Sequence, residues 1–559
     1  MSEVRHIISN DYDPTDFIPP DHHEDGSVDI FKDYLDEEDE ADGDELEFDR
    51  EDGSLNKIET VKGDGTVEKS GRKKRWINGK SSRLKNGFVE DKVIKLAINN
   101  SNKMAILRCL YTHRQLDMFQ IGRVATPHMH KKSVGNLLAE MYAQQLLNRD
   151  NLLKASRAKG DEKKYHYRLA KLGLYIIATF DLHALWNYEH PTLPKQHYLL
   201  RNLAVGSQQA HHFETQEFMS RLLYNLTQKG IYFPHSDWRR YPIQDLRVTG
   251  KITPYRPDWF IFKPNPFYSE LVKNRRTTEC PLNIPVESRQ AAEKDILKEH
   301  YTGFLSIECD LKTEDSREIE DKCKKFLYSL DYYPHNNMAF FSVNGWYEND
   351  VLLPAPKNHT QMRARNTKKI IIRHMEEELI FDKTQVLHGD EVTCLTSSEF
   401  FIENNGNMLH GYPRAQDFAM YVNATPHTLE KESVFFTDEL KKIILNPPLP
   451  IMPDEVIRIR NFGVAETHMI FLAKLGWVNP IAKALKMQKW IDEGNQKAKV
   501  VLVYPNAEEL DSEVHFTDPP FYYVNWEEVC RSGIWGHYKK PVYRKIRNIN
   551  TLTWEDVDQ

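Results

Sequence analysis

The residues with the clearest chemical potential lie in two short stretches near the middle of the chain. The first, residues 256–262, reads RPDWFIF, and the second, residues 304–313, reads FLSIECDLKT. A strand points alternate side chains to opposite faces, so the second stretch predicts a strand with Glu308, Asp310 and Lys312 on one face. Both stretches therefore predict buried strands that carry carboxylates near one end.

Carboxylates on neighbouring strands suit the hydrolysis of a phosphodiester. They can hold a hard divalent cation, which polarises the phosphate and activates water. A nearby lysine can stabilise the charge that develops on the phosphate oxygens. Asp258 lies far from Asp310 in the sequence, so the fold must bring the two together. The alternative is a Pro-Asp turn before one strand and the solvated face of another.

A Pro-Asp pair followed by acid-x-Lys resembles the PD-(D/E)xK superfamily of metal-dependent nucleases. This resemblance implies that Asp258, Asp310 and Lys312 are catalytic and that Asp258 and Asp310 hold Mg²⁺ or Mn²⁺. An acidic triplet that leads through a threonine into a helix also resembles the replication-relaxation family of bacterial plasmids and mobile elements. That family often reads Glu-x-Asp, which Glu308 and Asp310 fit, so both registers stay open.

Helices and strands that could position these acids are predicted on both sides of them. Residues 211–226 have the apolar spacing of a helix, and nuclease folds often place an extra acid there, which Glu214 or Glu217 could supply as a metal ligand. The adjacent His211 and His212 diverge by about 100° on a helix, which disfavours a shared ion.

A basic insertion over 263–300 separates the two acidic strands. A helix capped by Ser316, an apolar strand over 338–343 and a basic helix over 363–373 follow the second strand. This order predicts a right-handed crossover and a mixed sheet flanked by helices, like that of restriction endonucleases.

Residues 92–180 predict a winged helix that binds DNA. Three helices are expected over 104–111, 116–124 and 130–147, followed by two strands that enclose a polar basic loop. The start of the third helix and the loop supply the expected DNA contacts: Lys131, Lys132, Ser133, Asn136, Lys154, Arg157, Lys159, Lys163 and Lys164. A winged helix that contacts protein is the alternative.

Charge is distributed unevenly along the chain. The net charge of the 559 residues is −7, but residues 1–53 hold 21 acids against three bases. Residues 1–70 have few large apolar side chains and predict an acidic disordered tail, followed by a basic linker over 71–91. The tail either competes with a polyanion for the basic body or only improves solubility.

Composition bounds the class of protein. The six cysteines form no CxxC pair, which indicates reduced thiols, and no stretch of about twenty apolar residues predicts a membrane span. We expect a cytoplasmic protein. Phosphate-loop, zinc-protease and serine-esterase motifs do not occur.

The sequence predicts a multidomain α/β and α+β protein. A winged helix precedes a nuclease-like domain over 205–375, and a further α+β domain of unknown role covers 385–559. In that last part we expect helices near 465–475 and 480–492 and a buried strand over 500–504. We find no internal repeat, and a second Pro-Asp pair, at 453 and 454, is interpreted as a loop.

The expected function is DNA binding in the replication or maintenance of a plasmid, phage or mobile element, as the family resemblance implies. Double-stranded DNA is the expected partner, and replication or mobile-element proteins are further candidates. The main hypothesis is a Mg²⁺- or Mn²⁺-dependent endonuclease. The rivals are a non-catalytic replication initiator with a degenerate nuclease fold and a transcription regulator.

Overall fold

The computed structural model describes much of the chain from residue 94 onward and two short strands before it. The described residues are 59–61, 67–69, 94–151, 165–178, 207–231, 239–242, 247–248, 251–252, 255, 257–264, 301–311, 315–330, 336–343, 345–348, 351–354, 357–410, 434–435, 449–461, 464–494, 498–516, 520–528, 543–549 and 552–557. Within these residues the fold is a mixed α/β architecture of several sheets and helices, which confirms the predicted class.

The chain divides into two compact units. In the first unit, helices and a three-stranded sheet of order β3-β5-β4 alternate between residues 101 and 178. The elements are α5 (Ser101–His113), β3 (Leu116–Asp117), α6 (Met118–Val124), α7 (Lys131–Ala143), β4 (Leu147–Asn151), β5 (Tyr165–Leu169) and α8 (Lys171–Ala178). Helices 104–111, 116–124 and 130–147 were predicted here, and the structure shows all three with shifted ends.

Local chemistry fixes these ends. The side chain of Asn100 accepts a hydrogen bond from Lys103 N at the start of α5, and Asp117 forms a capping box with Gln120 at the start of α6. The buried Lys103 ammonium donates to Glu140 at 2.8 Å and to Gln144 at 3.0 Å. These two bonds join α5 to α7.

Further short strands belong to the first unit: β1 (Glu59–Val61), β2 (Val67–Lys69), β6 (Arg239–Pro242), β7 (Arg247–Val248) and β8 (Lys251–Ile252). The antiparallel pair β1 and β2 falls within the stretch predicted to be disordered, so that prediction does not hold for these six residues. The linker over 71–91 lies outside the described residues.

The second unit begins with the region in which the acids were expected. Its elements are α11 (Ser207–Gln228), β9 (Trp259–Pro264), β10 (Tyr301–Asp310), α14 (Ser316–Ser329), β11 (Asn337–Ser342), β12 (Gly345–Glu348), β13 (Val351–Pro354), α15 (Lys357–Ile380), β14 (Val386–Asp390) and α16 (Glu391–Glu403). Four strands follow the order β14-β11-β10-β9, and β11 runs parallel to both β10 and β14.

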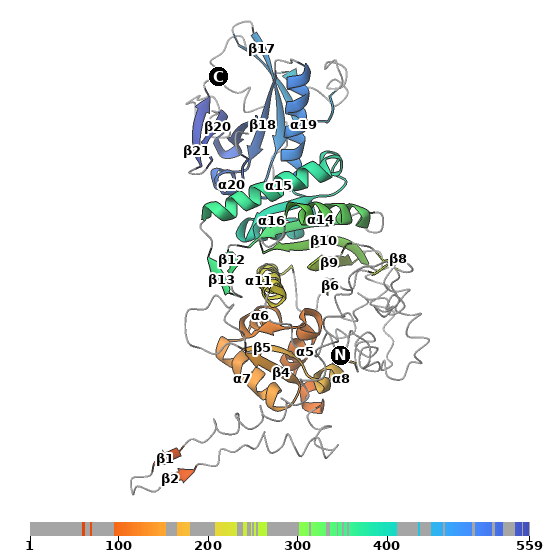
Figure 1. Cartoon of the computed structure of the whole chain (residues 1–559), viewed down its shortest axis with the longest axis vertical. Coiled ribbons are helices and arrows are strands. Elements are labelled where there is room, and N and C mark those ends of the chain that lie inside the picture. Colours follow the sequence, from red (N-terminus) through yellow and green to blue (C-terminus); the bar gives the residue numbers. More distant parts are fainter. Residues whose placement is uncertain are drawn as a thin grey trace. The chain divides into compact units, whose positions relative to one another are not determined.

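Helices cover both faces of this sheet (Figure 1). On one face, Phe218 of α11 stacks on Phe341 of β11 with ring centroids 4.2 Å apart. On the other face, Phe340 joins a core with Phe326 of α14 and Ile371 of α15. Because Phe340 and Phe341 are adjacent on a strand, they define the two faces of the sheet.

The chain continues into a seven-stranded sheet of order β15-β16-β17-β18-β19-β20-β21. Its elements are β15 (Val434–Phe435), β16 (Glu455–Asn461), β17 (Val464–Leu472), α19 (Asn479–Gly494), β18 (Ala498–Tyr504), α20 (Ala507–Ser512), β19 (Tyr522–Asn525), β20 (Tyr543–Asn548) and β21 (Thr553–Val557).

Two sequence predictions for this region are corrected. The helix expected over 465–475 is the strand β17, which pairs antiparallel with β16 and parallel with β18. Its side chains from Met469 to Ala473 are all buried, so a continuous apolar run concealed the strand's period of two. The start of the last domain, expected at residue 385, also lies further along the chain. Strand β14 pairs with β11 in the first sheet, and α16 packs against these two strands.

One continuous core joins the two sheets of the second unit. It contains Phe340 and Ile371 from the first part and Phe471, Leu502 and Tyr523 from the second. Cys309, Cys323 and Cys394 of this unit are buried free thiols. In the described residues no helix is both long and apolar enough to cross a membrane.

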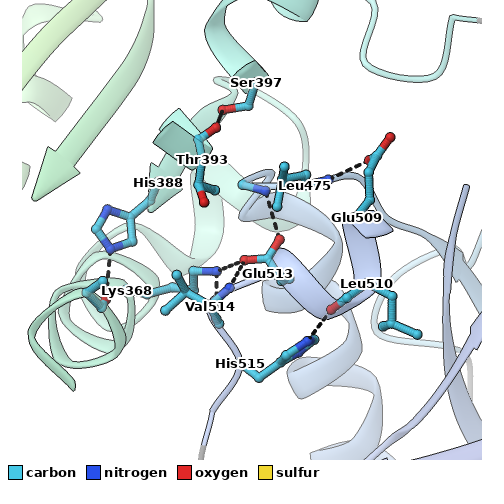
Figure 2. A network of polar contacts seen from close by, with 12 residues as sticks. Lys368, His388, Thr393, Ser397, Leu475, Glu509, Leu510, Glu513, Val514 and His515 are labelled. Atoms are coloured by element: carbon cyan, nitrogen blue, oxygen red, sulfur yellow. Dashed lines mark hydrogen bonds and ion pairs between the residues drawn. The ribbon is translucent and has the colours of Figure 1, made fainter. Parts of the chain in front are cut away.

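A buried ion pair also joins the two parts (Figure 2). Lys368 of α15 is fully buried and donates to a carboxylate oxygen of Glu513 and, at 2.9 Å, to the carbonyl of Val514. The other oxygen of Glu513 accepts from Gly476 N at 2.8 Å. Both charges are therefore paired and hydrogen-bonded, as burial requires.

Replacing Lys368 by Met should lower the free energy of unfolding of the second unit by about 3–5 kcal/mol, because Glu513 would keep a buried charge without its partner. Adding Glu513→Gln should restore part of that loss. Chemical denaturation measures both, with Lys369→Met, at an exposed position of the same helix, as the control. Equal stability of the Lys368 and Lys369 variants would contradict the role of the ion pair.

Candidate functional site

Asp258 lies where the first acidic stretch enters β9. Its side chain is buried, and Oδ2 accepts a hydrogen bond from the backbone N of Cys309, 2.7 Å away on β10. Nε2 of His211, on α11, lies 3.2 Å from the same carboxylate oxygen and 3.2 Å from the Cys309 carbonyl oxygen. Asp258 therefore fastens the beginning of one strand to the end of its neighbour.

Glu308 precedes Cys309 on β10 and lies on the face covered by α14. Only 1% of its surface is exposed, and Nζ of Lys322, on α14, lies 3.0 Å from Oε2. The side chain of Tyr255, which is also buried, interacts with the same carboxylate. The same ammonium lies 5.8 Å from the ring centroid of Phe340, opposite Glu308 on β11.

The two carboxylates influence each other's protonation. Burial, together with the negative charge of Asp258, raises the pKa of Glu308 to about 7 against the charge of Lys322. Burial alone would raise the pKa of Asp258 too, but the charges of His211 and Lys322 lower it. Two adjacent acids thus differ in protonation near neutral pH, an arrangement found in acid-base sites.

His211 is the histidine that faces Asp258. Burial lowers the pKa of its imidazole, but the charge of Asp258 and the hydrogen bond to it have the larger combined effect, so the pKa is raised overall. The sequence disfavoured a shared metal ion for His211 and His212. The structure gives His211 a different contact, because it faces Asp258.

Asp310 shares the strand face of Glu308 but has other partners. Its two oxygens accept from Nε and Nη2 of Arg363, at 2.8 and 3.1 Å, and Oδ2 also accepts from Ser342 at 3.1 Å. Such a bidentate pair orients the carboxylate and neutralises its charge. The charge of Asp258 acts on Glu308, and which of the two registers is catalytic stays a prediction.

Two other expected site residues lie elsewhere. Glu217 of α11 pairs with Arg221 at 2.8 Å, and Arg221 also contacts Glu391 of α16 at 3.2 Å. Glu214, one turn earlier, is buried and contributes to the raised pKa of Cys309. Lys312 lies outside the described residues, so Lys322 is the lysine that the structure places beside the acids.

Expected DNA-contacting residues occupy the start of α7. Lys131, Lys132, Ser133 and Asn136 are all exposed, and Val134 between them is buried. Nζ of Lys131 lies 4.4 Å from the ring centroid of Phe119 on α6. The loop residues Lys154, Arg157, Lys159, Lys163 and Lys164 lie outside the described residues.

The sequence did not identify two residues that complete this site. Lys322 was recognised only as lying off the apolar stripe of its helix, and Arg363 only as part of a basic helix. One sequence signal could have identified Lys322. Helix α14 begins soon after β10 ends, because Asp315 forms a capping box at its start. The first turns of such a helix lie over the strand that precedes it.

The described donors fit only a sparse metal site. Among the residues that the structure describes, no group of three His, Cys, Asp or Glu side chains is arranged to hold an ion. Asp258 and Glu308 offer two carboxylates, and Mg²⁺ often binds to one or two carboxylates, water and substrate phosphate. The two acids therefore suit a cation that the substrate helps to hold.

Comparison with known proteins matches part of the chain to one family. Residues 107–341 match the model of the replication-relaxation family, and this span includes α7, Asp258, Glu308 and Lys322. The resemblance inferred from the acidic triplet is thereby confirmed over that span. Searches of curated proteins and of solved structures returned no match.

Replacing Glu308 by Gln should change how stability depends on pH. A carboxylate whose pKa rises on folding stabilises the fold below its unfolded value and loses that contribution as pH rises through its folded value. As pH rises from the ordinary pKa of 4.5 to the folded pKa of about 7 and beyond, the free energy of unfolding of wild type should fall by up to about 3 kcal/mol. The free energy of unfolding of Glu308→Gln should not show this fall.

Denaturant unfolding of the metal-free protein at pH 4.5 and pH 8 measures this difference. Asp321→Asn, on the solvent side of α14, is the matched control and should follow wild type. Parallel pH profiles for wild type and Glu308→Gln would contradict the raised pKa.

Proposed function

We propose that the protein binds DNA in the replication of a plasmid or other mobile element and hydrolyses a phosphodiester bond with Asp258, Glu308 and Lys322. The observation that carries the proposal is the buried ion pair of Glu308 and Lys322 beside Asp258. The match to the replication-relaxation family supports the replication role.

Each residue has a distinct part in this proposal. Asp258 stays ionised because His211 and Lys322 favour its charged form, so it can hold a cation or orient water. Glu308, with a pKa of about 7, can take a proton from the attacking water near neutral pH. Lys322 can stabilise the extra negative charge on the phosphate oxygens.

The proposed reaction balances as a simple hydrolysis. The oxygen of water forms a bond to phosphorus, and one ester P–O bond breaks. The proton leaves water for Glu308 and then passes to the departing oxygen. A bound Mg²⁺ or Mn²⁺, held by Asp258 and Glu308, would supply polarisation of the phosphate and activation of water.

DNA binding is assigned to the first unit. Helices α5, α6 and α7 with the strands β4 and β5 have the order of a winged helix, in which α7 would be the recognition helix. The exposed Lys131, Lys132 and Asn136 at its start support this assignment, since helix starts commonly contact bases and phosphates. The first sheet of the second unit, with α14 after β10, supports the nuclease-like fold.

A non-catalytic replication protein is the second candidate. One specific observation favours it: every acid of the site has a cationic partner, since Asp258 faces His211, Glu308 faces Lys322 and Asp310 faces Arg363. A site of this kind could retain its charges for structure alone, with DNA binding as the remaining activity.

Cleavage of a supercoiled plasmid in the presence of Mg²⁺ or Mn²⁺ separates the two candidates. Asp258→Asn should abolish cleavage, and Lys322→Met should lower its rate by about 10²–10³ because a charge-stabilising donor is lost. Lys324→Met, on an exposed part of the same helix, should cleave like wild type. Cleavage by Asp258→Asn at the wild-type rate would exclude this site.

Replacing Lys131, Lys132 and Asn136 together by Ala should weaken DNA binding without unfolding the first unit, because their side chains are exposed. If the two lysines contact phosphates, the slope of log affinity against log salt should fall by about 1.8. Electrophoretic or fluorescence titration at several salt concentrations measures it. Lys171→Ala, at an exposed position of α8, is the control, and unchanged binding by the triple variant would indicate a protein-contacting helix.

A further inference from the structure

The second Pro-Asp pair repeats the structural role of the first. Pro453 and Asp454 directly precede β16, just as Pro257 and Asp258 directly precede β9. Oδ2 of Asp454 accepts from Leu472 N on β17 at 2.7 Å, the distance at which Asp258 accepts from Cys309 N. The pair lies in the loop before β16, as predicted, but its carboxylate also joins two strands, which the sequence did not indicate.

The elements that follow also correspond. Helix α14 begins seven residues after Cys309, and α19 begins seven residues after Leu472. Each helix is followed by two strands that extend the sheet in parallel. These strands are β11 and β14 in one case and β18 and β19 in the other. We call residues 257–403 the first repeat and residues 453–528 the second repeat.

The strand register agrees across three strands of each repeat. Cys309 is opposite Phe341, which is opposite Gly389. In the second repeat Leu472 is opposite Val503, which is opposite Val524. A slip of one residue in any strand would move its side chains to the other face, so this agreement is a specific one.

The last strands end in the same way. Asp390 follows Gly389 and accepts a hydrogen bond from Thr393 N, three residues on, at 2.8 Å. Asn525 follows Val524 and accepts from Glu528 N, also three residues on, at 2.8 Å. The repeats thus agree at the start, across the sheet and at the cap that follows it.

The repeats differ at the acids. By this register Phe471 stands where the first repeat has Glu308, and Ala473 stands where it has Asp310; both are fully buried. Neither side chain can bind a cation or carry a proton. Asp454, the one acid that is kept, has the strand-fastening role of Asp258.

We propose that the chain is a tandem pair of nuclease-like repeats in which only the first is catalytic, so that it cuts one strand of duplex DNA per binding event. This inference rests on the proposed function. A double-strand break needs two sets of acids, one for each scissile phosphate, or two successive cuts by one set. The part of the chain that the structure describes holds one set.

The second repeat acts as a built-in partner for the first. Corresponding faces of the two sheets contribute to one core, with Phe340 from the first and Phe471 and Leu502 from the second. The buried Lys368–Glu513 pair joins the repeats within this core. Replacing the second set of acids by apolar residues removes the cost of burying charge there.

Cleavage of supercoiled plasmid by the full chain with Mg²⁺ tests the proposal. We expect open circles to accumulate until supercoiled DNA is exhausted, with linear DNA formed only afterwards. Glu308→Gln should slow nicking by about 100-fold or more. Phe471→Leu, an apolar change at the corresponding position, should nick at the wild-type rate.

The failures are distinguishable. Linear DNA that appears as a primary product, at the rate at which supercoiled DNA disappears, would overturn the single-cut inference and leave the nuclease assignment intact. Absence of any cleavage by wild type would overturn the nuclease assignment and the inference with it.

Titration with Mn²⁺ alone gives a second readout that does not depend on turnover. Calorimetry on the full chain should find one ion per chain, lost in Asp258→Asn. Two ions per chain, one of which persists in Asp258→Asn, would contradict a single site. No bound ion in wild type would contradict the proposed metal site.

Discussion

The hydrogen bond from the Cys309 backbone to Asp258 is the constraint on which the rest of the second unit depends. It fastens β9 to β10 at the point where both carry acids, and the adjacent Glu308 is thereby held on the face that α14 covers. A buried carboxylate is tolerated only with partners, and here His211 and Lys322 provide them from helices on opposite faces of the sheet. The positions and charges of the two acids therefore depend on the packing of the two helices that carry His211 and Lys322.

This balance of charge also limits how a cation can bind. Lys322 already lies against Glu308, and a metal ion would compete with that ammonium and with the proton that the raised pKa of Glu308 favours. Metal binding would therefore release a proton and shift Lys322 toward the substrate phosphate. In the proposed site, binding of a cation and of a polyanion would both be linked to the proton on Glu308.

Much of the first unit and of the acidic strands was predictable from the sequence. Apolar spacing located α5, α6, α7 and α14, and alternation located β10 with its acids on one face. Contacts between distant segments were not predictable: Lys322 and Arg363 have the exposed pattern of ordinary helix cations until the sheet brings them to Glu308 and Asp310. Apart from the short connection between β10 and α14, the sequence contains no signal for which cation faces which acid.

Strand β17 and the second repeat show another limit of prediction from the sequence. A strand that is buried on both faces has a continuous apolar run in place of alternating residues. The run in β17 therefore resembles that of a buried helix. The second repeat also lacks the acids that identify the first, and its Pro-Asp pair alone is a weak motif. Only the hydrogen bonds of Asp454 and Asn525 and the strand register make the relation visible.

The shared core has a consequence for how the protein is made. Phe340 and Ile371 pack in one core with Leu502, Tyr523 and Ile546, which the ribosome adds later. Until those residues emerge, the apolar faces of α15 and β11 stay uncovered, and the nascent chain depends on chaperones or on a compact intermediate. The acids near residue 308 therefore reach their final environment only after the residues of the second sheet have been synthesised.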